Sequence, residues 1–256
     1  MTTALVTGAS AGIGRAFAQG FAARGADLVL VARDEARLDV LAADLVERHG
    51  VRAEVLRADL VDRADLAAVE ARLHDDDAVD VLVNNAGFGT YGPFADADVD
   101  TEMREIDLNV TALVRLTHAA LVAMRPRGRG AIVNVSSLAG FQPAPSSATY
   151  AATKAFVNSF THSVHEEARR AGVHVMAVCP GYTHTEFHER AGLGPSEIPE
   201  FLWQSADDVV EVALRDLDRR RSVSIPGGVN KVVGAASSVT PSVISRRIAG
   251  LVVRRT

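Results

Sequence analysis

The chain has 256 residues, of which 48% are hydrophobic and 23% are charged, and its formal net charge is −5. A chain of this length suits one α/β domain and buries roughly three quarters of its unfolded surface, so the core needs no covalent staple. The acidic balance argues against a nucleic-acid partner, because phosphate binding needs a basic surface. The only cysteine is Cys179, which excludes an internal disulfide and fits a reducing compartment.

The start of the chain carries no targeting pattern. An apolar run at 4–6 follows Met1 with no basic segment before it, which argues against a signal peptide. No apolar run is seen that reaches the ~18–20 residues needed to span a bilayer. We therefore expect a cytoplasmic protein.

Short strand-like runs alternate with longer helical patterns. The runs are rich in valine, leucine and isoleucine, as in a parallel sheet that is covered on both faces. The expected strands are 4–7, 27–31, 53–57, 79–83, 131–135, 174–178 and 223–225. The expected helices are 13–24, 35–49, 63–74, 100–124, 147–171 and 206–219. This alternation predicts one α/β domain, a Rossmann-type doubly wound parallel sheet flanked by helices.

Two regions interrupt the alternation. Residues 186–204 carry two glycines and two prolines among apolar side chains, and such an excursion is either a substrate loop or a surface helix pair. Residues 227–256 follow the last strand and mix apolar with basic side chains. We expect them to form an amphipathic cap over the substrate crevice, with weak peripheral contact to a membrane as the alternative.

A glycine-rich turn follows the first strand. Gly8, Gly12 and Gly14 let the chain turn tightly and let its backbone approach a pyrophosphate. The N–H groups at the start of the next helix point at that anion. The spacing differs from the Gly-x-Gly-x-x-Gly of many dehydrogenases, and no Lys-Ser/Thr pair follows, so a P-loop ATPase is a poor interpretation. The turn predicts dinucleotide binding.

The residues after the second strand indicate which dinucleotide binds. An acidic residue there holds the ribose 2′-OH of NAD, whereas an arginine holds the 2′-phosphate of NADP. Ala32 and Arg33 stand at this place, which favours NADP(H). NAD(H) stays the alternative because Asp34 follows directly, and Arg33 could also be only a solvated residue at a helix start.

Three polar residues are candidates for catalysis. Tyr150 and Lys154 are four residues apart in a predicted helix, so they share one face. A nearby ammonium lowers the pKa of a phenol from ~10, which makes the pair a general acid/base unit. Ser137 follows the fifth strand, where ligands of such sheets bind. Its hydroxyl either hydrogen-bonds the substrate oxygen or only caps a helix.

Asparagines stand at two further positions. Asn84 and Asn85 follow the fourth strand, where their amides suit a turn or the fastening of strands around a cofactor. Asn109 lies inside a predicted helix, where asparagine is mildly unfavourable. It is therefore either functional or part of an interhelical contact.

Together these residues closely resemble the short-chain dehydrogenase/reductase family. The motifs occur in family order from residue 4 to about 185, and they are Thr7-Gly8-x-x-x-Gly12-x-Gly14, Asp59-Leu60, Asn84-Asn85-Ala86-Gly87, Asn109, Ser137, Tyr150-x-x-x-Lys154 and Pro180-Gly181. The resemblance implies an NAD(P)-dependent oxidoreductase that acts on CH–OH or C=O groups and assembles as a homodimer or another homo-oligomer.

The resemblance also implies roles for the matching positions. Tyr150 exchanges the proton with the substrate oxygen, and Ser137 orients that oxygen. Lys154 binds the nicotinamide ribose and lowers the pKa of Tyr150, while Asn109 holds the water of a proton relay. The implied cofactor-binding residues are Gly8, Ser10, Gly12, Ile13, Gly14, Arg33, Asp59, Leu60, Asn85, Ala86, Gly87, Tyr150, Lys154, Pro180, Gly181, Thr183 and Thr185.

Two departures from the family pattern matter. Ala11 stands where many NADP-dependent relatives carry a basic residue, so NADP selection rests mainly on Arg33. The end of the chain also lacks the Val-Asp-Gly-Gly-like turn of many tetrameric relatives. The usual tetramer interface is therefore not implied.

Other functions stay open beside this one. A dinucleotide-binding sensor or scaffold that has lost catalysis is the main alternative, although the intact catalytic set argues against it. A sugar-nucleotide epimerase or dehydratase would need more chain after residue 185. His184 and His188, with Glu189 beside them, do not make up the convergent ligands of a zinc site, so no metal is predicted. Apolar residues favour a bulky or lipophilic carbonyl substrate, and they are Phe88, Phe141, Phe187, Leu193 and Trp203.

Overall fold

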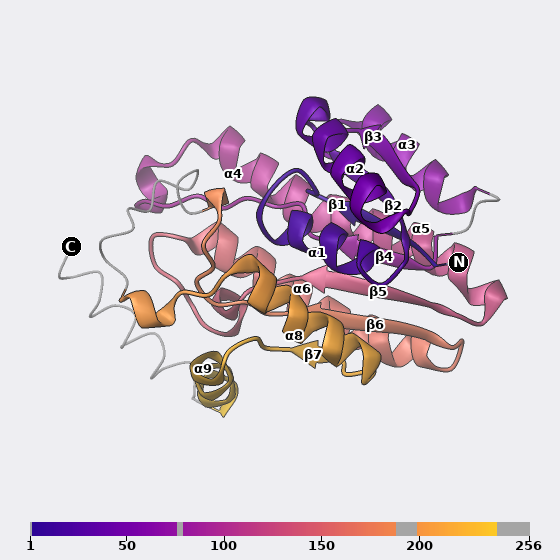
Figure 1. The fold of residues 1–256 in the computed structure, drawn as a ribbon. Coiled ribbons are helices and arrows are strands. Elements are labelled where there is room, and N and C mark those ends of the chain that lie inside the picture. Colours follow the sequence, from indigo (N-terminus) through magenta and orange to yellow (C-terminus); the bar gives the residue numbers. More distant parts are fainter. Residues whose placement is uncertain (1, 76–78, 188–198, 240–256) are drawn as a thin grey trace.

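A seven-stranded sheet forms the centre of the computed structural model, which describes residues 2–75, 79–187 and 199–239 (Figure 1). Every strand pairs with its neighbours in parallel. The spatial order is β3 (Ala53–Arg57), β2 (Asp27–Ala32), β1 (Thr3–Thr7), β4 (Val81–Asn84), β5 (Gly130–Val135), β6 (Val173–Val178) and β7 (Val223–Ser224). The predicted doubly wound sheet is confirmed, although β4 begins two residues later than expected.

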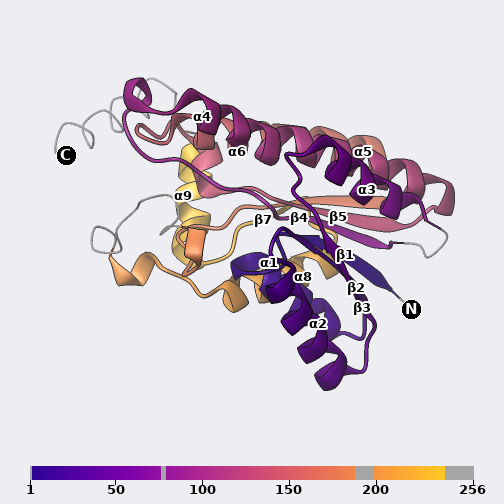
Figure 2. The ribbon, with the colours of Figure 1, turned by 90° about the horizontal axis from the view of Figure 1, so that it is seen from above.

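Helices cover both faces of the sheet (Figure 2). One layer contains α1 (Gly12–Ala22), α2 (Glu35–His49) and α8 (Ala206–Asp218). The opposite layer contains α3 (Arg63–His74), α4 (Val99–Ile106), α5 (Leu113–Met124) and α6 (Ala148–Arg169). Because the first β-α-β units extend the sheet from β1 towards β3 and the later ones from β4 towards β7, the strand order reverses between β1 and β4. Ligands of such sheets bind at the carboxyl ends of the strands beside this reversal.

Alternating side chains of the strands build two cores. Val6 and Val83 contribute to one buried apolar cluster, which also contains side chains of α1, α2 and α8. The neighbouring Leu5 and Leu82 contribute to a second cluster, with side chains of α3, α5 and α6. Since successive side chains of a strand point to opposite faces, a strand buried on both faces needs an unbroken apolar run. This is the pattern that the sequence shows.

The predicted helix 100–124 is not one regular α-helix. Between α4 and α5 the residues Asp107–Ala112 form a π-helical segment. A π-turn adds a residue to the helical repeat and rotates the faces of the helix on its two sides relative to each other. The periodicity of a regular helix therefore misplaces Glu105 relative to the residues after the π-turn. Such turns are frequent at functional sites, and Asn109 lies in this one.

The helical stretch Val99–Arg127 has the length and apolar composition of a membrane span, although no such run was expected from the sequence. Its inner face belongs to the second core cluster, in which Leu116, Ala120 and Met124 are almost completely buried. A core helix passes the same test of length and composition. We interpret the stretch as the long core helix of this domain.

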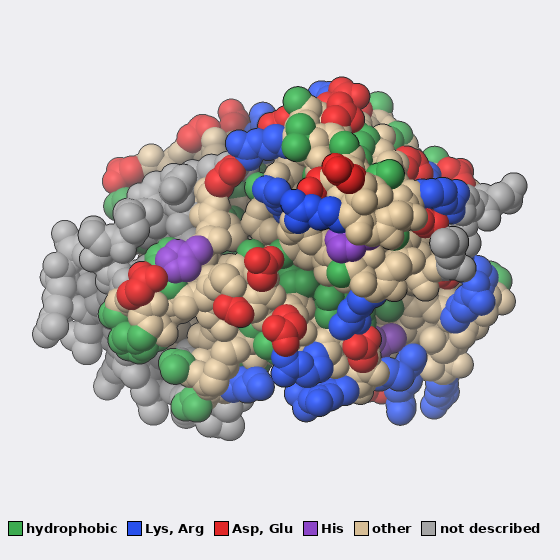
Figure 3. Space-filling model, in the orientation of Figure 1, with side chains coloured by type: hydrophobic (Ala, Val, Ile, Leu, Met, Phe, Trp, Pro, Cys, Tyr) green, Lys and Arg blue, Asp and Glu red, His purple; other side chains and the backbone are tan. Residues whose placement is uncertain are grey.

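Helix α9 (Gly228–Val239) follows β7 and lies within the expected cap 227–256. It packs against the short helix Leu138–Phe141, which directly follows Ser137. The rest of the expected cap, 240–256, lies outside the described residues. On the face drawn in Figure 3, acidic and basic side chains are intermixed.

Candidate active site

The turn after β1 depends on its glycines. Gly8 and Gly12 have φ angles of 67° and 53°, which is the left-handed region that glycine adopts without strain. A Cβ on Gly14 would collide with the carbonyl oxygen of Gly8 and with the side-chain amide of Asn85. The chain can therefore turn from β1 into α1 this closely only with glycine at these positions.

Helix α1 begins without a side-chain cap. Its N-cap residue is Ala11, no side chain accepts a hydrogen bond from its first turn, and that turn contains no acidic residue. In contrast, Asp34, Asp62 and Asp98 cap the helices that they precede. The first N–H groups of a helix carry a partial positive charge, so an uncapped start suits an anion. The half-buried Ser10 and Ile13 border this start. The turn thus fits the pyrophosphate of a dinucleotide.

The hydroxyl of Thr7 joins β1 to β4 beneath this turn. It accepts hydrogen bonds from the backbone N–H groups of Asn85 and Ala86, at 2.9 and 3.0 Å. The side-chain amide of Asn85 donates in return to the Thr7 carbonyl, at 2.9 Å. These bonds fasten the carboxyl ends of the two strands at which the strand order reverses, as the pair of amides suggested. Gly87 follows directly and lies next to Asn109 and Lys154.

Arg33 and Asp34 have different surroundings after β2. Arg33 is exposed at the carboxyl end of the strand. Asp34 accepts a hydrogen bond from the Arg37 backbone at 3.1 Å, and its second oxygen lies 3.3 Å from Arg37 Nε. Its carboxylate is therefore engaged at the start of α2, while the Arg33 side chain faces solvent. At the end of β3, Asp59 accepts a bond from Val61 N at 3.2 Å, and Leu60 is buried.

The predicted catalytic side chains come together beyond β5. Tyr150 and Lys154 lie on successive turns of α6, with Lys154 Nζ 5.6 Å from the centre of the Tyr150 ring. Lys154 donates a hydrogen bond to the Val135 carbonyl at 3.0 Å, which fixes its ammonium at the end of β5. Ser137, two residues later, is hydrogen-bonded to Tyr150 through their side chains. The hydroxyl of Ser137 also accepts from Ala139 N at 3.1 Å, so Ser137 caps the short helix Leu138–Phe141 and also contacts Tyr150.

Burial shifts the pKa values of Tyr150 and Lys154 in opposite directions. Desolvation raises the pKa of Tyr150 to about 12, while the hydrogen bond with Ser137 acts in the opposite direction. Desolvation lowers the pKa of Lys154 to about 8, although the negative charge of Glu105 opposes this. Burial thus holds the pKa of Tyr150 above its ordinary value in the protein alone, and the expected lowering by Lys154 stays a prediction. Desolvation of the half-buried phenol favours its neutral form.

Asn109 is held from two sides. Its amide nitrogen donates to the Phe88 carbonyl at 2.8 Å and lies 3.2 Å from Thr153 Oγ1, while its oxygen accepts from Phe88 N at 3.2 Å. A Cβ on Gly87 would lie 2.8 Å from Asn109 Oδ1 and 3.6 Å from Lys154 Nζ. The amide and the ammonium thus meet beside Gly87, which must be glycine for this approach.

The segment after β6 closes the crevice. The Pro180 carbonyl accepts from Leu138 N at 2.9 Å. Thr183 is buried and bridges to Gln204, and the methyl group of Thr185 lies over Gly12. The ring of Phe187 lies 5.4 Å from the ring of Tyr150. The fold therefore brings the predicted residues of 180–187 to both the glycine turn and the catalytic tyrosine.

The other sequence candidates lie at the rim or outside the site. His184 stacks on Trp203, with 4.7 Å between ring centres, and its Nε2 lies 3.2 Å from Glu200 Oε1. Within the described part of the chain, no group of three or more His, Cys, Asp or Glu side chains could hold a metal ion. Cys179 is buried. His188, Glu189 and Leu193 lie outside the described residues.

The sequence patterns did not predict three features of the site. These are the buried carboxyl of Glu105, the ion pair of Arg37 with Glu186, and the hydrogen bonds that join Asn230 of α9 to Gln204 and Pro226, both at 2.8 Å. The ion pair spans 149 residues of the chain and the bond from Asn230 to Gln204 spans 26, which is beyond the reach of a local pattern. Glu105 belongs to α4, whose sequence VDTEMREI contains other charged residues, so no local pattern singles it out.

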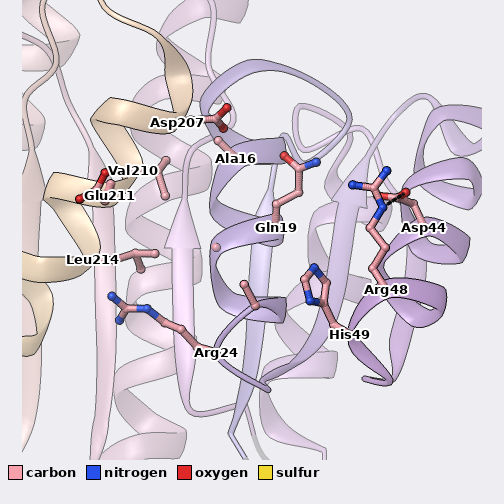
Figure 4. A pocket seen from close by; sticks show the side chains of 12 residues that line it. Ala16, Gln19, Arg24, Asp44, Arg48, His49, Asp207, Val210, Glu211 and Leu214 are labelled. Atoms are coloured by element: carbon pink, nitrogen blue, oxygen red, sulfur yellow. Dashed lines mark ion pairs between the residues drawn. The ribbon is translucent and has the colours of Figure 1, made fainter.

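A surface groove of about 400 Å³ lies elsewhere, between α1, α2 and α8 (Figure 4). Its charged lining residues include Arg24, Arg48 and Asp44, and Arg48 pairs with Asp44 at 2.7 Å. It contains none of the predicted catalytic residues. The predicted catalytic residues lie instead at the carboxyl edge of the sheet, at the end of β5 and in α6.

Comparisons with known proteins agree with the family resemblance of these residues. A family model described as short chain dehydrogenase matches residues 2–194. A solved short-chain dehydrogenase from Sphingobium yanoikuyae, in complex with NADPH, is 46% identical with a TM-score of 0.85, over 88% of this chain and 87% of that one. The bulky-bulky ketone specific alcohol dehydrogenase from Comamonas testosteroni is 36% identical with a TM-score of 0.81, over 94% and 95%.

A curated relative of different substrate class is also similar. Sulfoacetaldehyde reductase 2 from Chromohalobacter salexigens is 41% identical over 219 residues, which are 81% of this chain and 85% of the relative. The family model covers well over half of the chain, and the relatives are dehydrogenases and reductases. The chain therefore belongs to the short-chain dehydrogenase/reductase family, oxidoreductases that act on alcohol and carbonyl groups.

Proposed function

We propose that this protein is an NADP(H)-dependent oxidoreductase that transfers a hydride between the nicotinamide and a ketone, an aldehyde or a secondary alcohol. The observation that carries the proposal is the convergence of Tyr150, Lys154 and Ser137 beside the uncapped start of α1. A sensor without catalysis needs the glycine turn but not a convergent Tyr-Lys-Ser set.

The fit of NADP(H) rests on the residues after β1 and β2. Gly8, Gly12 and Gly14 allow the tight turn from β1 into α1, whose uncapped start suits the pyrophosphate. The exposed Arg33 is available for the 2′-phosphate, whereas Asp34 is engaged with Arg37 and is a poor partner for a ribose hydroxyl. The relative from Sphingobium yanoikuyae, described in complex with NADPH, supports the same choice. NAD(H) stays the alternative cofactor.

The other cofactor contacts follow from the same crevice. We assign Ser10, Ile13, Asp59, Leu60 and Asn85 to the adenosine and pyrophosphate half. We assign Ala86, Gly87 and Lys154 to the nicotinamide half, together with Pro180, Gly181, Thr183 and Thr185. When bound, the nicotinamide supplies or accepts the hydride.

The chain's own residues move the proton. In reduction, the Tyr150 hydroxyl donates its proton to the carbonyl oxygen, and Ser137 hydrogen-bonds that oxygen as charge develops on it. Since burial raises the pKa of Tyr150 to about 12, the side chain is a protonated donor at neutral pH. Lys154 binds the nicotinamide ribose, and we assign Asn109, fixed by Phe88 and Thr153, to the water that leads the relay to solvent.

The rim of the crevice favours a bulky or lipophilic carbonyl compound. Phe187 packs on the Tyr150 ring, and Tyr182 packs on Trp203 with 5.7 Å between ring centres. Helix α9, tied to this rim through Asn230, forms the described part of the proposed cap. The Comamonas testosteroni relative is named for bulky ketones. A small polar aldehyde, as in the name of the Chromohalobacter salexigens relative, is the alternative.

The test is a titration of the purified protein with NADPH and NADH, followed by a panel of aldehydes and ketones that ranges from small and polar to bulky. We expect tighter binding of NADPH and turnover of bulky members of the panel. Binding without turnover of any compound would favour the sensor. No binding of either cofactor would contradict the assignment of the glycine turn. Cytoplasmic location and homo-oligomeric assembly stay predictions from the sequence.

A further inference from the structure

Glu105 is a completely buried carboxyl in the last turn of α4. One oxygen, Oε2, accepts hydrogen bonds from the backbone N–H of Thr90 at 3.0 Å and from its hydroxyl at 2.9 Å. The other oxygen, Oε1, is buried and has no hydrogen-bond partner among the described residues. Burying a carboxylate that is half satisfied is costly, so such groups often serve a function.

Glu105 contacts the wall of the active site through Thr90. A Cβ on the preceding Gly89 would lie 2.8 Å from Cδ2 of Tyr150, so the backbone here packs directly on the tyrosine ring. Asn109 binds the backbone of Phe88 from the same helical stretch. Two polar side chains on either side of the start of the π-turn thus hold 88–90 against Tyr150.

Glu105 also acts on the catalytic residues through its charge. Its negative charge raises the pKa values of both Lys154 and Tyr150 on α6. Among the described residues, the charges that act on Glu105 are Glu102 of its own helix and Lys154 of α6. Burial, the largest cause, raises the pKa of Glu105 to about 7, so its charge changes near neutral pH.

We propose that Glu105 is a positioning residue of the reaction, which holds the 88–90 segment against Tyr150 and whose charge sets the pH range in which Lys154 and Tyr150 work. This inference rests on the proposed function. It goes beyond the family motifs given above, because those motifs do not include Glu105. A purely structural role would consist of the two bonds to Thr90 alone. The two roles differ in their effect on the pH profile.

The main test is the pH profile of kcat/KM for carbonyl reduction in Glu105→Gln. Reduction needs a protonated Tyr150, so kcat/KM falls at high pH, where Tyr150 and Lys154 lose their protons. Removing the negative charge lowers both pKa values, and this fall should therefore move to lower pH by about half a unit or more. Glu102→Gln, which removes a buried carboxyl one turn away, should move it much less. An unshifted fall in Glu105→Gln would overturn the proposal.

A second variant separates charge from contact. Glu105→Asp keeps the charge but withdraws the carboxyl from Thr90, so kcat/KM should drop while the profile stays at the wild-type pH. A profile shifted as far as that of Glu105→Gln would contradict the charge role. An unchanged kcat/KM would contradict the contact role.

A measurement without substrate tests the proposed charge of Glu105 independently of the proposed function. Because the pKa of Glu105 is raised in the folded state, its contribution to stability is present below the unfolded pKa and is lost as pH rises towards about 7. Relative to wild type, Glu105→Gln should therefore gain unfolding free energy between pH 5 and pH 8, as measured in denaturant. If the difference in unfolding free energy between Glu105→Gln and wild type does not change with pH, the proposed charge of Glu105 is contradicted, even if no substrate is turned over. Absence of wild-type turnover alone would count against the proposed function.

Discussion

Arg37 and Glu186 form an ion pair across the carboxyl edge of the sheet. Arg37 Nη1 lies 2.8 and 3.0 Å from the two carboxylate oxygens of Glu186. Arg37 belongs to α2, which follows β2, whereas Glu186 follows β6, and the strands β1, β4 and β5 lie between them. Thr185, beside Glu186, lies over Gly12 of the glycine turn. The pair therefore links two sides of the crevice in which we expect the dinucleotide.

This pair should slow the release of the cofactor. Both side chains are partly exposed, so their interaction contributes no more than about 1 kcal/mol. In Glu186→Gln, NADPH should dissociate up to about fivefold faster in a stopped-flow chase, with little change in thermal stability. Glu211→Gln removes another exposed pair, with Arg215 on α8, and serves as the control. Equal dissociation rates in wild type and Glu186→Gln would contradict the role of the pair.

Tyr150→Phe removes the proposed proton donor while keeping the ring. General acid catalysis contributes roughly 10²- to 10⁴-fold, so kcat should fall by at least about two orders of magnitude. The Kd for NADPH should stay within about threefold, because the ring still packs against Phe187 and Gly89. Tyr91→Phe, a change at an exposed tyrosine of the rim, should leave kcat nearly unaltered. Retained turnover in Tyr150→Phe would refute the acid role.

Arg33→Asp should change the choice of cofactor. The guanidinium is expected to bind the 2′-phosphate, and an ion-paired hydrogen bond of this kind contributes about 1.5–3 kcal/mol. The ratio of kcat/KM for NADPH to that for NADH should therefore drop by about tenfold or more. Arg169→Asp, at the far end of α6, should not alter the ratio. If the ratio is equally unchanged in Arg33→Asp, another residue selects the cofactor.

His174 should make the fold sensitive to acid. It is buried in β6, its ring packs edge-on against His165 at 5.5 Å, and burial lowers its pKa to about 4. A depressed pKa of a histidine means that the unfolded state takes up the proton first. Its contribution to stability is therefore complete above pH ~6.5 and is lost as pH falls towards 4.

The measurement is the unfolding free energy of wild type and His174→Gln at several pH values. The variant loses packing at every pH, but its disadvantage should shrink between pH 6.5 and pH 4. A difference that does not depend on pH would show that His174 is not the titrating group.

Local patterns were enough to predict most of the architecture. Apolar runs that are buried on both faces, such as those of β1 and β4, can be recognised from a few neighbouring residues. The same holds for the glycine turn and for the four-residue spacing of Tyr150 and Lys154, because both geometries extend over little more than one turn of chain. Parallel topology then brings Ser137 to the same edge of the sheet without further information.

The sequence by itself thus determined the doubly wound sheet, the family motifs and the identity of the candidate catalytic residues. Tertiary structure alone decided three things, and each depends on groups that are distant in the chain. Thr90 donates hydrogen bonds to Glu105, which lies just before the π-turn at Asp107–Ala112. Long-range pairing joins Arg37 to Glu186. Desolvation by the surrounding fold, which no spacing encodes, raises the pKa of Tyr150 to about 12.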